Sequence, residues 1–201
     1  KVNAFTPQLL TELNLALDQA QESEQVVVLT GKEGILSAGF DLNIMRSGAT
    51  AQSQLINQGV KLMVRLLSFP TPVVIAANGH AVAMGAFLLL SGDIRIGTQG
   101  DFRIGFNEVA IGMAMPQFGI DLAQARLPLK YLNRTILLAD MLTPDIAIEA
   151  GFLDQVTPPE QLIDTALATA KTLSKLDMAS HHTSKLRLRA PLIEMLNKNL
   201  S

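Results

Sequence analysis

Glu108 is the residue of this sequence best placed for acid–base chemistry. It lies in the segment IGFNEVAIG, residues 104–112, where most of its neighbours are apolar. Burial among apolar side chains raises the pKa of a carboxyl group, and such a carboxylate can accept a proton near neutral pH. A surface glutamate on an alternating strand would give the same local pattern, so this segment alone leaves both interpretations open.

Two turns rich in small residues could bind an anion or a developing oxyanion. The first is SAGFDL, residues 37–42, and the second is NGHAVAMGA, residues 78–86, which opens an apolar helical run. Small residues let a ligand approach the backbone, and helix N-termini carry free N–H groups. Asp41 falls where its charge favours the next helix. The second turn lacks the Gly-Lys-Ser/Thr of a P-loop. Taken alone, the first segment is also explained by an ordinary strand-to-helix turn, and the second by tight helix–sheet packing.

Other polar residues give weaker indications. Three histidines show no metal-ligand spacing with carboxylates, so we predict no metal site: His80, His181 and His182. His181-His182 is expected to be a solvated helix start. Three cations of the last expected helix could contact ligand phosphates, although a solvated helix face is the simpler interpretation: Lys185, Arg187 and Arg189. Ser91 has no His or Asp partner at a recognisable spacing. Met113 and Met115 are expected to line a pocket or the core.

Alternating strands and helices must position these segments. Extended runs are expected at 25–30, 35–41, 72–77, 93–97, 101–104 and 152–156, with 93–97 and 101–104 half-exposed. Helices are expected after Thr6-Pro7 and at 55–69, 84–90, 116–126, 128–139, 143–150, 158–175 and 178–197. Residues 47–53 are expected to form a mobile loop. Because strands alternate with helices first and helices follow, the order predicts an α/β core with helices packed behind it.

One pattern occurs twice along the chain. Residues 26–39 and 73–85 each contain a β-branched strand, a turn, a short extended piece and a glycine before a helix. This predicts a duplicated ββα unit, although two unrelated buried strands would look the same.

Composition limits the classes of protein to consider. The chain has 201 residues, 48% hydrophobic and 17% charged, which excludes a disordered chain and suits one domain. Its net charge of −2 gives no general attraction to nucleic acid or anionic membranes. The absence of cysteine excludes disulfides and thiolate catalysis. No apolar stretch reaches the roughly 18 residues of a membrane span. With no signal peptide visible, we expect a cytoplasmic protein that binds neither nucleic acid nor membranes.

Taken together, the three segments resemble the crotonase (enoyl-CoA hydratase/isomerase) superfamily. The first oxyanion-hole segment of that family has a small residue, Ala-Gly, a variable residue and Asp-Leu/Ile, as residues 37–42 do here. The second has Asn-Gly, several small residues and a helix ending near Asp, as residues 78–93 do. The resemblance continues through Thr143-Pro144 and residues 147–156 and covers nearly the whole chain.

The resemblance implies a role for each of these segments. The backbone N–H groups of Phe40 and Met84 would form an oxyanion hole for a thioester carbonyl, and Glu108 would be the acid/base. The substrate would be an acyl-CoA thioester, and no cofactor beyond its CoA would be needed. The implied substrate-binding residues are Leu36, Ser37, Ala38, Gly39, Asp41, Leu42 and Gly85. Two fixed donors in a dry pocket stabilise developing charge, each by about 3 kcal/mol in comparable sites.

Departures from the family pattern favour one of its reactions. Hydratases of the family use two glutamates around a water, and the first of these falls on Phe87 here. Residues 104–108 resemble the Gly-Leu-Asn-Glu segment of Δ3,Δ2-enoyl-CoA isomerases, which favours double-bond migration with Glu108 alone. The alternatives are hydration or thioester hydrolysis with another acid, such as Asp121, and a non-catalytic binding protein of the same fold.

The resemblance also implies the architecture. We expect an α/β fold with a crotonase-like ββα-repeat core at residues 1–139 and a C-terminal helical trimerisation region at residues 140–201. Members of the family are usually trimers or paired trimers, so a homotrimer or hexamer is expected. The family's N-terminal β-hairpin is absent, its last helix is shortened, and the chain starts with Lys1 rather than Met. We therefore expect both ends to be truncated.

Overall fold

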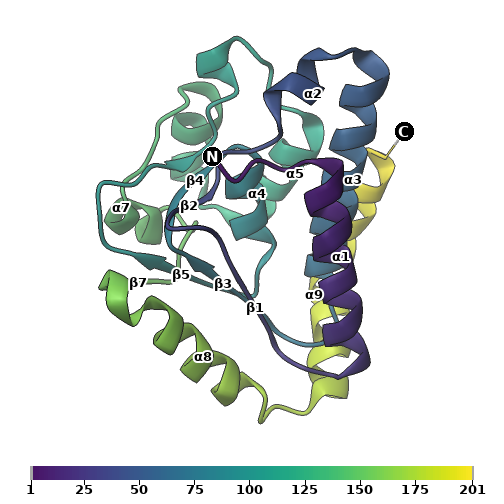
Figure 1. Ribbon diagram of the computed structural model, residues 1–201, viewed down its shortest axis with the longest axis vertical. Helices are drawn as coiled ribbons and strands as arrows, with labels where there is room; N and C mark the ends of the chain where they lie inside the picture. Colours follow the sequence, from purple (N-terminus) through teal and green to yellow (C-terminus); the bar gives the residue numbers. More distant parts are fainter. Residues whose placement is uncertain (1, 201) are drawn as a thin grey trace.

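Two parallel β-sheets form the centre of the protein in the computed structural model, which describes residues 2–200 (Figure 1). The larger sheet has the order β1-β3-β5-β7, and the smaller has the order β2-β4-β6. All pairs in both sheets are parallel. The strands of the larger sheet are β1 (Val27–Thr30), β3 (Val73–Ala77), β5 (Ile94–Thr98) and β7 (Gln155–Thr157). Those of the smaller sheet are β2 (Gly34–Ser37), β4 (Gly79–Val82) and β6 (Ile104–Gly105). The predicted α/β class is confirmed.

Helices surround the two sheets. In the first half of the chain they are α1 (Pro7–Glu22), α2 (Leu42–Arg46), α3 (Ala49–Leu67) and α4 (Met84–Ser91). In the second half they are α5 (Gln117–Arg126), α6 (Leu129–Leu132), α7 (Pro144–Glu149), α8 (Leu162–Leu173) and α9 (Met178–Lys198). Short 3-10 turns occur at η1 (Val109–Ile111) and η3 (Pro159–Gln161), and a π-helical turn at η2 (Asn133–Leu137). No helix within residues 2–200 is long and apolar enough to cross a membrane.

The repeated ββα unit is present, and a third pair of strands, β5 and β6, is divided between the two sheets in the same way. Each of β1, β3 and β5 lies in the larger sheet, and the strand after it lies in the smaller sheet. The register pairs Val27 with Val73 and Gly34 with Gly79. Gly79 permits this contact, because a Cβ there would lie 2.0 Å from the carbonyl carbon of Gly34. The units therefore stack in parallel, which brings their connecting turns to one side of the molecule.

Strand β3 divides the interior into two layers. Val73, Ile75 and Ala77 belong to the main core, which contains the fully buried α4. Val74 and Ala76 point to the opposite face and pack in a smaller cluster with residues of α8. Figure 1 shows α8 lying along that face of the larger sheet. A strand buried on both faces explains the unbroken apolar run at 73–77.

Several local predictions were wrong. The mobile loop expected at 47–53 is instead the start of α3: Gly48 makes the break at φ 141°, and Ala49 begins the helix. The helix expected at 128–139 widens into the π-helical turn η2. The strand expected at 93–97 is buried rather than half-exposed. Arg95 gave it an alternating appearance, but that side chain is paired with Asp154 at 2.6 Å. Of the strand expected at 101–104, only Ile104 is extended, paired in β6.

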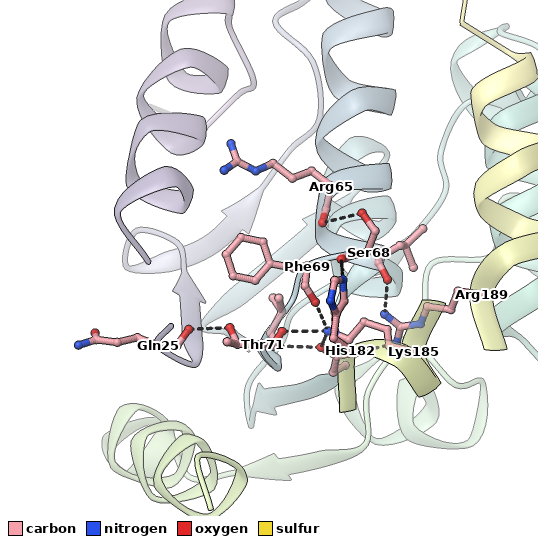
Figure 2. A network of polar contacts seen from close by, with 12 residues as sticks. Gln25, Arg65, Ser68, Phe69, Thr71, His182, Lys185 and Arg189 are labelled. Atoms are coloured by element: carbon pink, nitrogen blue, oxygen red, sulfur yellow. Dashed lines mark hydrogen bonds and ion pairs between the residues drawn. The ribbon is translucent and has the colours of Figure 1, made fainter. Parts of the chain in front are cut away.

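Helix α9 is attached to the core by buried cations. The Nζ atom of Lys185 donates to the carbonyl oxygens of Phe69 and Thr71, both at 2.9 Å (Figure 2). It also lies 2.7 Å from Oδ2 of Asp93, whose Oδ1 pairs with Arg189 at 2.8 Å. Burial lowers the pKa of Lys185. The solvated face expected for Lys185 and Arg189 is therefore wrong, whereas Arg187 is exposed as expected.

The expected solvated start of α9 is also wrong in part. The ring of His182 is half-buried, and its Nε2 lies 3.2 Å from the carbonyl oxygen of Ser68. Figure 2 shows this contact. His181 is half-buried beside it, and burial lowers its pKa. Both histidines thus lie on the same face of α9 as Lys185, and this helix packs against α3.

Candidate active site

A single cavity collects the residues that could do chemistry. It has a volume of about 340 Å³ and is bordered by the turns after β2 and β4, the segment after β6 and the start of α3. Its lining is mostly apolar and comprises Ala38, Phe40, Leu42, Met45, Gln52, Ile56, Ala83, Met84, Phe87, Asn107, Glu108, Ile111, Met113, Ala114, Pro116 and Phe118. Glu108 is the one carboxylate among these described residues. Such a cavity suits a largely apolar ligand with one polar reacting group.

The two glycine-bearing turns lie side by side, as an oxyanion hole built from both of them requires. A Cβ on Gly39 would lie 3.0 Å from the Cβ of Ala83 and 3.5 Å from the backbone nitrogen of Met84. A Cβ on Gly85 would lie 2.3 Å from the carbonyl oxygen of Ser37. Only glycine allows backbones to approach this closely. The parallel pairing of β2 with β4 places both turns at the same sheet edge.

The backbone N–H groups of Phe40 and Met84 are free to bind a ligand. Phe5 N–H donates to Gly39 O and Phe5 O accepts from Asp41 N–H, so the intervening Phe40 N–H points away from Phe5. Met84 is the first residue of α4, whose first N–H groups have no intrahelical partner. Within residues 2–200, neither amide donates a backbone hydrogen bond. Both residues line the same cavity, one from each glycine-bearing turn.

The backbone before each donor is held in an unusual conformation. Ala83 has φ 52° and ψ −119°, a combination that L-residues rarely adopt. Gly39 has φ 101°. After the first turn, the carboxylate of Asp41 caps α2 by accepting from Asn43 N–H at 2.9 Å and Ile44 N–H at 3.2 Å. These constraints orient both N–H groups before any ligand arrives.

Glu108 is buried at the wall of this cavity. Only 7% of the surface of this residue is exposed, and Oε2 has no hydrogen-bond partner among the described residues. Its backbone carbonyl accepts from Ile111 N–H and Met113 N–H, which fixes it at the start of the turn η1. Burial raises the pKa of Glu108, and hydrogen bonds from the backbone of Glu108 and Asn107 oppose that rise. The alternative of a surface glutamate on a strand is wrong.

Known protein families and relatives show which family this chain belongs to. The sequence model of the family described as "Enoyl-CoA hydratase/isomerase" matches residues 1–201. The chain belongs to the enoyl-CoA hydratase/isomerase family. Among its relatives is Enoyl-CoA delta isomerase 1, mitochondrial, of Homo sapiens, which is 29% identical over 195 residues. These residues cover 94% of this chain, and the match spans 65% of the human protein's length.

Relatives with other activities are about as similar. The 2,3-dehydroadipyl-CoA hydratase of Escherichia coli is 30% identical over 188 residues, which cover 93% of this chain and 72% of that protein. A crystal structure of an enoyl-CoA hydratase/isomerase family protein from Pseudomonas syringae superposes with a TM-score of 0.98. It is 48% identical, and the match covers all of this chain and 87% of that one. The crotonase-like fold is thereby confirmed.

The enoyl-CoA hydratase/isomerase resemblance placed Phe87 where hydratases carry their first glutamate, and the structure shows what surrounds it. The ring of Phe87 is stacked on Phe106 at 4.9 Å between centroids and meets Phe118 edge-to-face at 5.4 Å. Gly119 leaves room for it, since a Cβ there would lie 2.7 Å from Cζ of Phe87. This wall of the cavity is aromatic and carries no group that could move a proton.

The other predicted substrate-binding residues fall into two groups. Ala38 and Leu42 line the cavity together with the three predicted catalytic residues. Asp41 caps α2, and four others are buried without lining the cavity: Leu36, Ser37, Gly39 and Gly85. Ser37 is buried, and its hydroxyl accepts from Gly39 N–H at 3.1 Å. These residues shape the backbone of the turn, and any contact that they make with CoA stays a prediction.

Several cavity residues were not predicted from the sequence. Gln52 and Ile56 reach the cavity from α3, and Asn107 lies beside Glu108 with its Oδ1 buried and unpaired among the described residues. Helical spacing places Gln52 and Ile56 on one face, which could have indicated a shared environment. Met113 lines the cavity, while Met115 packs against the core. No spacing rule links α3 to the turn at residue 40, so only the tertiary contact shows it.

The remaining candidates have structural roles. Asp121 does not line the cavity: Oδ1 accepts from Gln117 at 2.7 Å and Oδ2 from Asn199 at 3.1 Å. His80 accepts from Arg103 N–H at 3.0 Å. Within the described part of the chain, no group of three or more His, Cys, Asp or Glu residues is arranged to hold a metal ion.

Proposed function

We propose that this chain is a Δ3,Δ2-enoyl-CoA isomerase, which moves the double bond of an acyl-CoA thioester. The observation that carries the proposal is one buried carboxylate in an apolar cavity that Phe40 and Met84 also line, and the N–H groups of these two residues donate no backbone hydrogen bond within residues 2–200. The family acts on acyl-CoA thioesters, and the human relative is named as an enoyl-CoA delta isomerase. No cofactor is required, because CoA arrives with the substrate.

The proposed reaction uses the carboxylate twice. Glu108 takes a proton from C2 of a 3-enoyl-CoA, and the electron pair of the C2–H bond forms a dienolate. The negative charge on the thioester oxygen is stabilised by the N–H groups of Phe40 and Met84. Glu108 then returns the proton to C4, which leaves the double bond between C2 and C3. The reaction therefore consumes no water and needs no second acid.

Hydration needs a second acid–base residue, which the described lining of this cavity does not provide. Adding water across a double bond requires a base to hold the water and an acid to protonate the adjacent carbon. Among the lining residues described, Glu108 alone can exchange a proton in this way, and Phe87 lines the same cavity with an aromatic ring. We therefore expect isomerisation to be the main reaction.

Two assays on the purified protein test the proposal. Conversion of a 3-enoyl-CoA to the 2-enoyl-CoA is measured alongside hydration of the 2-enoyl-CoA. The isomerase rate should exceed the hydratase rate by about 100-fold or more, the contribution of a missing general acid or base. Comparable rates of hydration would instead assign the chain to the hydratases of its family. Binding of an acyl-CoA without either reaction would assign it to non-catalytic binding proteins.

The isomerase rate should depend on the ionisation of Glu108. Burial raises the pKa of this carboxyl group above its ordinary value of 4.5, and the base must be ionised to act. The value of kcat/KM should therefore rise with pH through a limb whose midpoint lies above 4.5. A pH profile with a soluble 3-enoyl-CoA measures it. A midpoint at or below 4.5 would contradict a buried base.

Stability should show the opposite trend from the same ionisation. The folded state binds the Glu108 proton more tightly than the unfolded state, so the folded state is favoured at low pH. This contribution is lost as pH rises through the raised pKa. The Glu108→Gln variant lacks the effect, and the parent should lose stability relative to it over that pH range in denaturant titrations.

We propose a homotrimer or hexamer, which the family resemblance implies. Large apolar side chains are exposed around the second half of the chain, and burying them between subunits would be favourable: Leu129, Leu137 and Leu138.

A further inference from the structure

Gly59 of α3 supports both proposed oxyanion-hole residues. A Cβ at this position would lie 2.5 Å from Cζ and 2.8 Å from Cε1 of Phe40. It would also lie 3.3 Å from Cε of Met84. Phe40 and Met84 come from different sheet turns, yet their side chains converge on this one glycine. Gly59 is buried in the middle of a helix, where glycine is otherwise unfavourable by comparison with alanine.

The backbone around Phe40 is fixed more firmly than its ring. Phe5 forms hydrogen bonds to Gly39 at 2.8 Å and Asp41 at 3.0 Å, one on each side of Phe40. The ring of Phe5 meets the ring of Phe40 edge-to-face, with centroids 6.4 Å apart. The Phe40 ring is thus bounded by Phe5 and α3, and it borders the cavity. A larger residue at position 59 would push the ring rather than the backbone, and the space open to the ring is the cavity.

Ile56 links this contact to the apolar part of the cavity. It precedes Gly59 by three residues on α3, so the two share a helix face, and its side chain lines the cavity with Leu42 and Met45. The ring of Phe40 and the methyl group of Met84 therefore take space next to these aliphatic side chains. An acyl chain bound in the cavity would need that space.

We infer that Gly59 is a specificity-determining residue: by seating Phe40 and Met84 against α3, it keeps room in the cavity for long acyl chains. The inference rests on the proposed function only in requiring that acyl-CoA binds in this cavity. A side chain at position 59 would exclude part of a long chain and leave the thioester and a short chain in place.

Binding of saturated acyl-CoAs tests this inference without any turnover. The parent and Gly59→Ala are titrated with butanoyl-CoA and decanoyl-CoA. Each methylene kept out of apolar contact weakens binding by roughly fourfold. Exclusion of two methylenes should therefore weaken decanoyl-CoA binding by about tenfold or more, while butanoyl-CoA binding changes by less than about threefold. An equal change for both chains, or no change for either, would overturn the inference.

A second variant separates the contact with Phe40 from damage to the fold. Gly59→Ala/Phe40→Leu removes the ring atoms that the new Cβ would meet and keeps the backbone N–H of residue 40. It should recover decanoyl-CoA binding relative to Gly59→Ala, and failure to recover would overturn the inference. If Gly59→Ala alone does not fold, the double variant is compared with Phe40→Leu, which has the same side chain at position 40. The two should bind decanoyl-CoA equally, and weaker binding by the double variant would overturn the inference. Gln54→Ala, on an exposed part of α3, is the control and should match the parent for both ligands.

These measurements also distinguish the inference from the proposed function. Isomerase activity could be absent while the chain-length effect on binding is present, which would remove the isomerase proposal alone. If the parent binds neither acyl-CoA, the cavity is not an acyl-CoA site, and both would be overturned.

Discussion

Replacing Glu108 with glutamine should lower isomerase turnover by about 100-fold or more, the typical contribution of a positioned general base. Glutamine keeps the size and polarity of the side chain but cannot accept a proton from C2. Because Glu108 is the one carboxylate among the described residues that line the cavity, no neighbour there can replace it. The affinity for acyl-CoA should change little, since the two N–H donors are unaltered. Steady-state kinetics with a 3-enoyl-CoA and a separate binding titration measure both effects.

Two further variants make this result specific. Asp121→Asn removes a buried carboxylate that lies outside the cavity and bonds to Gln117 and Asn199. It should leave the proton-transfer step unchanged, although it alters a structural contact. Phe87→Ala should also retain proton transfer, although the space left by the ring is expected to reduce stability. Full isomerase activity in Glu108→Gln would contradict the single-glutamate mechanism, and loss of turnover in Asp121→Asn with acyl-CoA binding intact would restore Asp121 as a candidate acid.

Replacing Asp93 with alanine should lower the free energy of unfolding by about 3 to 5 kcal/mol, the usual effect of leaving buried charges unpaired. Asp93 pairs with Lys185 at 2.7 Å and with Arg189 at 2.8 Å. It also accepts from Val73 N–H at 2.7 Å. Lys185 would keep its contacts with two backbone carbonyls, which Figure 2 shows, but would lose its counter-charge. Denaturant unfolding of parent and variant gives the difference.

The matched control is an exposed ion pair on the same helix. Glu194 pairs with Lys198 at 3.0 Å, and both side chains are about 70% exposed, at 71% and 72%. Glu194→Ala should change stability by less than about 0.5 kcal/mol, because solvent screens an exposed pair. An effect of Asp93→Ala as small as this control would show that α9 is held by apolar packing alone. The stability difference between parent and Asp93→Ala should also depend on pH. The pKa of Lys185 lies below its ordinary value, so this difference should become smaller as rising pH neutralises the lysine.

Local sequence patterns were sufficient to predict the class of the fold and the three segments of the site. Buried strands are marked by unbroken β-branched runs such as residues 73–77, because both faces of these strands are covered. The turns before Phe40 and Met84 are marked by small residues, because the backbones there come within van der Waals contact of each other. Glu108 is marked by its apolar neighbours. Each of these signals is local, since it depends on what a few consecutive residues can do.

The roles of the charged and the cavity-lining residues depend on contacts between elements that are far apart in the sequence. Lys185 and Arg189 have the spacing of a solvated helix face, and nothing near them in sequence indicates Asp93, which precedes Lys185 by 92 residues. The cavity role of α3 was missed for the same reason. Gly59 looks like a helix-weakening residue until Phe40 and Met84 are found packed on it. Pairing and close approach depend on which surfaces meet, and that is set by the stacking of whole elements rather than by local sequence.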